Sequence, residues 1–205
     1  EAGTRRLRNR IERRFSQLKP ALYLGAIFKA RRAAPQWLGA ANCVPVEYMT
    51  GFRMSFRTAA IRAAGFDDNL QKYALDEDID ASFAAARSGL VIGARDAQIY
   101  HHRFPGGRGN GYTLGAIAVL NRVYVVMKHV ADGNLSDVQR HAARRRLTIF
   151  IWLKLLVSLA GTGSGFGRAR LRGAVAAARH ARALMNAPRA ELGETYRAAL
   201  KEIGV

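Results

Sequence analysis

The stretch Tyr73-Ala74-Leu75-Asp76-Glu77-Asp78-Ile79-Asp80 places four carboxylates within five positions and is followed by a helical pattern that continues to Arg87. Like charges this close repel one another, so a fold retains them only where positive charge balances them. The free N–H groups and the positive end of a helix dipole supply part of that balance. Two interpretations are open: a solvated first turn of a helix, or a pocket in which one carboxylate acts as a general base or binds a metal.

The positive charge of the chain is concentrated in two arms. The 205 residues carry a net charge of +18. Residues 1–32 hold ten Lys and Arg against two Glu, and residues 138–189 hold eleven Lys and Arg and no acid. Residues 33–137 hold ten charges of each sign and are neutral. Basic arms of this kind bind an anionic surface, either lipid headgroups or nucleic acid.

The single cysteine, Cys43, excludes an internal disulfide and fits a reducing compartment. The Arg-rich first residues are not followed by the apolar run of a signal peptide. Because the sequence starts at Glu1 rather than Met, we expect its natural N-terminus to lie further upstream.

Short strand-like patterns lie on both sides of the acidic stretch. A strand-like alternation links Val46, Tyr48 and Thr50 before Gly51, and apolar runs recur at 89–93 and 97–101. A glycine between two strand-like runs indicates either a tight turn or a close approach of the backbone to a ligand. Between these patterns, residues 57–64 are predicted to form a helix that ends at Gly65.

From residue 113 onward the pattern is helical, with helices predicted over 114–130, 137–160 and 169–185. The apolar run 147–157 is shorter than the roughly 20 residues of a transmembrane helix and contains Lys154. We therefore expect it to lie at a membrane interface or to dock against protein.

Four motifs follow one another between residues 46 and about 130. The first is Tyr48-Met49-Thr50-Gly51-Phe52-Arg53-Met54-Ser55-Phe56-Arg57, and the second is Ala64-Gly65-Phe66-Asp67-Asp68. The acidic helix start is the third, and Asp96-Ala97-Gln98-Ile99-Tyr100-His101-His102 is the fourth. A glycine loop, a turn of this kind, an acidic helix start and a histidine that ends a later strand occur in the same order in family 2 inverting glycosyltransferases. The chain thus resembles the acceptor-side half of that family.

The resemblance implies an α/β fold, namely the C-terminal half of a GT-A-like mixed sheet followed by a helical, membrane-associating appendage. It divides the chain into a basic helical segment at 1–35, an acceptor-side catalytic region at 36–130, and a basic helical segment at 131–205. The family's nucleotide-binding half, with its Asp-x-Asp motif, would precede residue 46. Because residues 1–45 contain no aspartate, we expect that half to lie outside this sequence.

The resemblance also implies catalytic roles for two residues of the acidic helix start. Sugar transfer with inversion requires a carboxylate base for the attacking hydroxyl, and the match assigns that role to Asp78. Glu77 would contact the acceptor or hold the start of the helix. The loop residues Gly51 and Arg53 would bind the substrate.

The same resemblance assigns binding of the leaving diphosphate to residues 101–108. His101 would be a ligand of Mg²⁺ or Mn²⁺, and Arg103 and Arg108 would contact the phosphates. For His101 a structural role at the end of a strand is also open. The glycine-rich loop around the two arginines is also consistent with a flexible connection.

The resemblance therefore implies a metal-dependent glycosyltransferase active in polysaccharide biosynthesis, and together with the basic arms it leads us to expect the protein at the cytoplasmic face of the cell membrane. It would transfer a sugar from a nucleotide-sugar donor to a polysaccharide or lipid-linked acceptor. The alternative is a non-enzymatic basic module that binds a membrane or nucleic acid through its arms. Nucleic acid is the less favoured partner, because the sequence has no zinc, RNP or helix-turn-helix signature.

Overall fold

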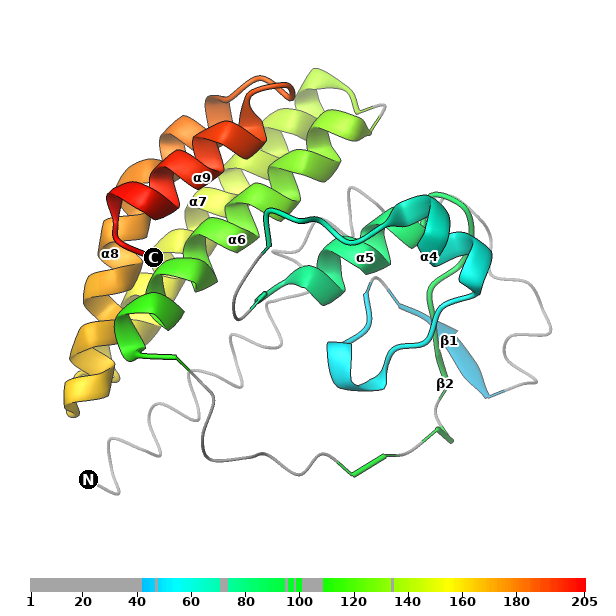
Figure 1. Cartoon of the computed structure of the whole chain (residues 1–205), viewed down its shortest axis with the longest axis horizontal. Coiled ribbons are helices and arrows are strands. Elements are labelled where there is room, and N and C mark those ends of the chain that lie inside the picture. The colour runs from blue at the N-terminus through cyan, green and yellow to red at the C-terminus, as the bar shows by residue number, and fades with distance from the viewer. Residues whose placement is uncertain are drawn as a thin grey trace. The chain divides into compact units, whose positions relative to one another are not determined.

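The structure is a computed structural model that describes residues 42–46, 48–70, 74–94, 96–97, 99–100, 109–133 and 135–205. The chain divides into two compact units, one formed by Phe28–Gly107 and the other by Arg108–Val205 together with Glu1–Ile27. Figure 1 shows the first unit as short elements joined by loops and the second as long helices. The predicted division at residues 130 and 131 differs from this one, because the helix that follows residue 110 is part of the helical unit.

The described part of the first unit, residues 42–100, contains two short strands and short helices. Strands β1 (Cys43–Pro45) and β2 (Ile92–Ala94) pair antiparallel, with Val44 opposite Gly93. A 3₁₀ turn η1 (Gly51–Arg53) and two α-helices, α4 (Thr58–Ala64) and α5 (Glu77–Ala85), lie between them in the chain.

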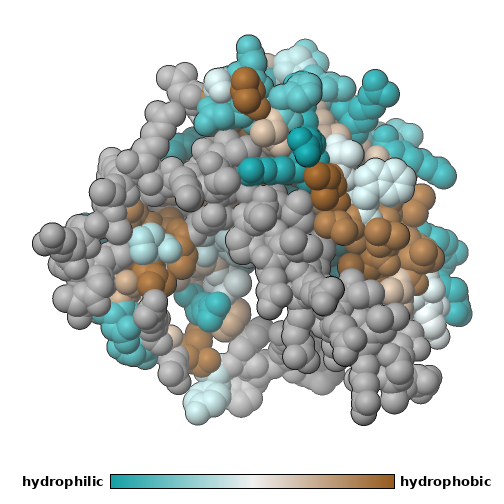
Figure 2. Space-filling model, turned by 180° about the vertical axis from the view of Figure 1, so that it is seen from behind, coloured by the Kyte–Doolittle hydropathy of each residue, from teal (hydrophilic) through white to brown (hydrophobic). Residues whose placement is uncertain are grey.

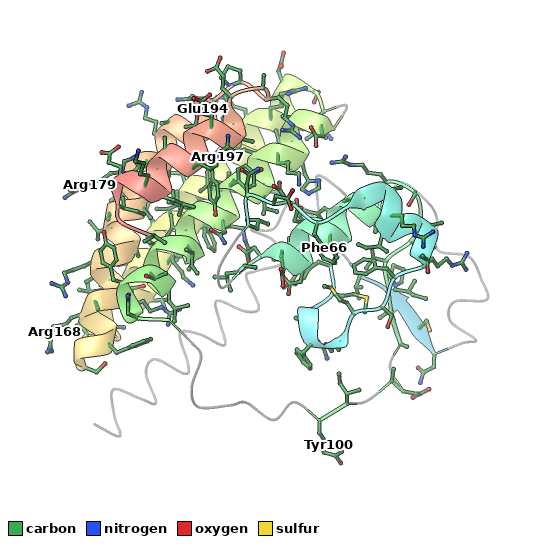
Figure 3. All side chains as sticks on the ribbon, in the orientation of Figure 1. Phe66, Tyr100, Arg168, Arg179, Glu194 and Arg197 are labelled. Carbon is green, nitrogen blue, oxygen red and sulfur yellow. The ribbon has the colours of Figure 1, made fainter. Side chains whose placement is uncertain are left out.

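Helix α4 confirms the helix predicted over 57–64. Gly65 follows it at φ 67°, a left-handed conformation that glycine adopts without cost, and its N–H donates to the carbonyl of Ile61 at 2.8 Å. Phe66, which follows this glycine, is 57 % exposed; Figure 3 labels it.

The expectation of an α/β fold with a GT-A-like mixed sheet is wrong. Within the described residues the only sheet consists of β1 and β2, three residues each, and most residues belong to helices. Residues 48–50 are irregular, and residues 51–53 form the 3₁₀ turn, in agreement with the interpretation of Gly51 as a tight turn. Alternating side chains make a strand only where a second strand accepts its backbone hydrogen bonds, and the described residues supply such a partner only at β1 and β2.

The helical unit contains α6 (Gly111–Asp132), α7 (Asp137–Leu159), α8 (Gly165–Asn186) and α9 (Leu192–Glu202). Side-chain caps begin the first three of these helices. Asn110 accepts from the N–H of Thr113, Ser136 forms a capping box with Gln139, and Ser164 accepts from the N–H of Gly167. These local signals explain why the helices predicted from periodicity appear close to their expected bounds.

Helices α6 and α8 pack with their backbones in contact. A Cβ atom added to Gly115 would overlap the carbonyl oxygen of Arg170, and one added to Gly173 would overlap the carbonyl oxygen of Tyr112. The two contacts are reciprocal, since each helix contributes a glycine against the backbone of the other. Only residues without a side chain permit this approach.

Helix α6 is the core of the helical unit. Leu120, Val123 and Val125 are completely buried, and the ring of Tyr124 stacks on that of Tyr196 from α9 with centroids 4.4 Å apart. The Tyr196 hydroxyl donates to Oδ1 of the buried Asn121 at 2.7 Å, which satisfies both polar groups. Among the described helices α6 alone is long and apolar enough to cross a membrane, but most of it is buried inside the protein, as a core helix would be.

Candidate active site around Asp78

The acidic helix start is formed by a backbone turn at Asp76. This residue precedes α5 with φ 76° and ψ 8°, a left-handed conformation that side chains other than Asn and Asp adopt rarely. The N–H of Glu77 donates to the carbonyl of Ala74 at 3.1 Å, which closes the turn. Strained conformations of this kind are concentrated at functional sites, so the turn marks the start of α5 as a candidate.

The loop that carries Gly51 is bound to the first turns of α5. The N–H of Gly51 donates to Oδ2 of Asp78 at 3.0 Å. A second contact joins the same loop to α5, because the N–H of Met49 donates to Oγ of Ser82 at 3.1 Å. The Ser82 hydroxyl in turn donates to the carbonyl of Asp78 at 2.7 Å. Two motifs that are 27 positions apart in the sequence are thus joined at one carboxylate.

Two backbone donors orient the Asp78 carboxylate. Its Oδ1 accepts from the N–H of Ile79 at 2.9 Å, while Oδ2 accepts from Gly51. The side chain is half-buried at the first turn of a helix, where free N–H groups and the helix dipole favour negative charge. The position therefore holds an oriented carboxylate that remains accessible to a small molecule.

The four carboxylates differ in their environment. Asp76 and Asp80 are buried, at 7 % and 2 % exposure, whereas Glu77 is exposed. Partial desolvation of the Glu77 carboxyl, with the charge of Asp78 as a second cause, raises its pKa above the ordinary value of 4.5. The cluster thus presents Glu77 and Asp78 toward solvent and keeps the other two carboxylates inside.

Arg53 lies on the same loop as Gly51. Its Nε donates to Oγ1 of Thr50 at 2.9 Å, and its guanidinium lies 5.5 Å from the centroid of the Phe52 ring. Arg53 itself is exposed, so a cation is held on the loop that contacts Asp78. A guanidinium in this place can bind a phosphate or a carboxylate.

The structure brings four of the predicted site residues into one region: Gly51, Arg53, Glu77 and Asp78. The other three, His101, Arg103 and Arg108, lie outside the described residues. Sequence reasoning missed Ser82, which ties the loop to α5. Its signal was a small hydroxyl residue four positions after Asp78, on the same face of the helix.

The residues described by the structure do not form a metal site. Among them no three His, Cys, Asp or Glu side chains gather closely enough to hold an ion. Within the acidic cluster the carboxylates lie in different environments, and Asp78 accepts hydrogen bonds from two amides. The predicted metal ligand His101 lies outside the described residues, so a Mg²⁺ or Mn²⁺ site stays a prediction.

Comparison of the chain with protein-family models, with curated proteins and with solved structures gives no match.

Proposed function

We propose that the region around Asp78 is the acceptor side of a glycosyl-transfer site and that Asp78 is its general base. The observation that carries the proposal is the hydrogen bond from Gly51 to Asp78, because it joins the glycine loop to the acidic helix start. The proposal depends on this site and not on a GT-A sheet. The donor would be a nucleotide-sugar and the acceptor a hydroxyl of a polysaccharide or lipid-linked glycan.

The reaction proposed is an in-line displacement with inversion at the anomeric carbon. The acceptor oxygen forms a bond to that carbon while the bond from the carbon to the nucleoside diphosphate breaks. The hydroxyl proton passes to the Asp78 carboxylate, and the electron pair of the broken bond leaves with the diphosphate. General-base assistance of this kind contributes about 10²–10⁴-fold to the rate.

The neighbours of Asp78 have positioning and binding roles in this proposal. The two backbone N–H groups hold the carboxylate in one orientation, which keeps its oxygens directed at a bound hydroxyl. Glu77, exposed beside it, would hydrogen-bond to acceptor hydroxyls, and Arg53 would contact an anionic part of the substrate.

The roles of Arg103, Arg108 and His101 stay predictions, and no step of the proposed reaction passes through a metal. If His101 is a metal ligand, His101→Ala should abolish the metal dependence of nucleotide binding in calorimetry. An unchanged metal dependence would assign His101 to a structural role.

The test is transfer of radiolabel from a panel of nucleoside-diphosphate sugars to membrane glycolipids and polysaccharide by the full-length gene product. Asp78→Asn should lower the rate by about 10²–10⁴-fold, because the amide cannot accept the proton. Asp68→Asn is the matched control, since Asp68 is an exposed aspartate in a turn of the same unit. It should leave the rate near that of the parent.

Near-normal transfer by Asp78→Asn would remove Asp78 from the role of base. Absence of transfer by the parent protein with every donor would favour the alternative, a basic module without enzymatic activity.

A further inference from the structure

Helix α7 presents a row of exposed apolar side chains along its C-terminal half. Its members recur at spacings of three and four, and therefore lie on one face of the helix. They are Ile149 at 37 %, Trp152 at 64 %, Leu156 at 58 % and Leu159 at 56 % exposure. We call these four residues the α7 row. Figure 2 shows brown hydrophobic surface next to teal hydrophilic side chains on the right of the view.

The opposite face of α7 already supplies the contacts that fold the helical unit. Leu147, Phe150 and Ile151 are buried, at 4 %, 8 % and 8 % exposure. The guanidinium of Arg122 from α6 lies 5.4 Å from the centroid of the Phe150 ring. The inward face of α7 is thus packed against the core, whereas the α7 row is exposed. Phe150 does not belong to that outer surface, although the sequence alone places it in the same apolar run.

The neighbouring helix α8 presents a row of arginines. Arg168, Arg172, Arg179 and Arg182 are exposed and recur at spacings of four, seven and three, which places them on one face. We call them the α8 row, and Figure 3 shows Arg168 and Arg179 projecting outward from α8. Residues 138–189 contain no acid. Within the part of the chain that the structure describes, no ion pair engages Arg172, Arg179 or Arg182.

We propose that the α7 row is a binding surface for an anionic lipid bilayer and that the α8 row, on the adjacent helix, attracts the same bilayer electrostatically. Arginines extend their charge to headgroup phosphates while their stems remain on the protein surface. The α7 row would enter the boundary between headgroups and acyl chains, where Trp is favoured. This inference is independent of glycosyl transfer, because it uses no residue of the Asp78 region.

Charge and polarity on the two rows favour lipid over the other occupants. Nucleic acid would satisfy the arginines through its phosphates but would leave the α7 row without apolar contacts. A second copy of the chain would cover the α7 row but would bring two arginine-rich surfaces toward each other. A bilayer with anionic headgroups offers apolar contacts to the α7 row and attracts the arginines of the α8 row.

The first measurement is sedimentation of the full chain with vesicles of phosphatidylglycerol and phosphatidylcholine, compared with vesicles of phosphatidylcholine alone. We expect binding to the anionic vesicles at low salt that weakens, but persists, at high salt. A Trp37→Phe background makes Trp152 the sole tryptophan. Its emission should shift to the blue on binding, because the indole leaves water.

Matched variants separate the two rows. Arg179→Ala with Arg182→Ala should weaken binding at low salt by about 30-fold, from the typical contribution of two surface arginines. Its control is Arg57→Ala with Arg62→Ala, which removes the same charge from exposed positions of the other unit.

Trp152→Ser should weaken binding by about tenfold or more at every salt concentration. Its control is Phe66→Ser, at a similarly exposed aromatic.

Three results would overturn the proposal. The first is that the chain stays in the supernatant with anionic vesicles at low salt. The second is that the control variants lose as much binding as the row variants. The third is that the chain is a dimer in solution which Trp152→Ser converts to a monomer, because the α7 row would then be covered by a second copy.

Discussion

The two units of this protein are held together by different kinds of contact. In the helical unit the buried apolar residues extend from Ala116 on α6 to Ala199 on α9, and helices α6 and α8 pack with their backbones in contact. Among the described residues of the other unit the buried apolar side chains are few: Leu70, Ile79, Ala81 and Phe83. Its loops are held instead by hydrogen bonds from backbone N–H groups to side chains such as Asp78 and Ser82.

This difference indicates a division of roles. A core of closely packed helices obtains its stability from apolar burial, and its side chains are not accessible to a substrate. A site needs polar groups that are accessible and oriented, and these contribute less to stability because water competes for them. We therefore expect the stability of the helical unit to depend most on side-chain size at packed positions. In the Asp78 region we expect stability to depend on backbone conformation and charge.

The largest effect on stability is expected where α6 meets α8. Gly115→Ala should destabilise the helical unit by about 2–3 kcal/mol, because the added methyl overlaps the backbone of Arg170, which cannot move aside as a side chain can. Urea unfolding followed by circular dichroism at 222 nm measures the loss. The control is Gly165→Ala on α8, where the nearest heavy atom is the flexible end of Arg168. Equal stability of the two variants would contradict the close packing of the helices.

A smaller effect is expected at the turn before α5. Asp76→Gly and Asp76→Ala both remove the carboxylate, so they differ only in how easily the backbone adopts φ 76°. Asp76→Ala should be the less stable of the two by about 1 kcal/mol, because a Cβ atom is strained in the left-handed region. Thermal unfolding of both variants gives the difference. If the alanine variant is as stable as the glycine variant, the turn is not left-handed.

The smallest effect concerns the charge of Glu77. Its raised pKa means that the fold disfavours the ionised form, so its contribution to stability decreases as pH rises from 4.5 through the folded-state pKa. Replacing Glu77 by Gln should therefore stabilise the first unit slightly at neutral pH. Below pH 4.5, where the Glu77 carboxyl is protonated, the replacement should not stabilise it. Glu194→Gln is the control, since Glu194 is likewise an exposed glutamate in the first turn of a helix.

NMR titration of the side-chain carboxyl distinguishes the two causes of this shift. In Asp78→Asn the pKa of Glu77 should fall but remain above its ordinary value, because desolvation is the larger cause. A pKa that does not change in this variant would show that the two carboxylates do not interact.

Local features of the protein were predictable from neighbouring residues. Helix α4 and its final Gly65, the acidic start of α5, and helices α6, α7 and α8 all depend on signals within a few positions of one another. Hydrogen bonds from residue i to i−4, caps and left-handed glycines involve adjacent parts of the chain. The proximity of the Gly51 loop to Asp78 was implied by a family resemblance, and the hydrogen bond between them is what the structure adds.

The sequence by itself determined which segments are helical and where charge and apolar residues concentrate. Only the tertiary structure decided that residues 48–50 and the described residues 97, 99 and 100 would not extend a sheet, that Phe150 faces inward while Trp152 faces outward, and that α6 packs directly on α8. Helix α9 lies within the segment 131–205 that was predicted to be helical, although its bounds were not predicted. The physical reason is that strand pairing and the burial of a helix face depend on partners distant in the chain, whereas helix formation depends on residues that are neighbours in the sequence.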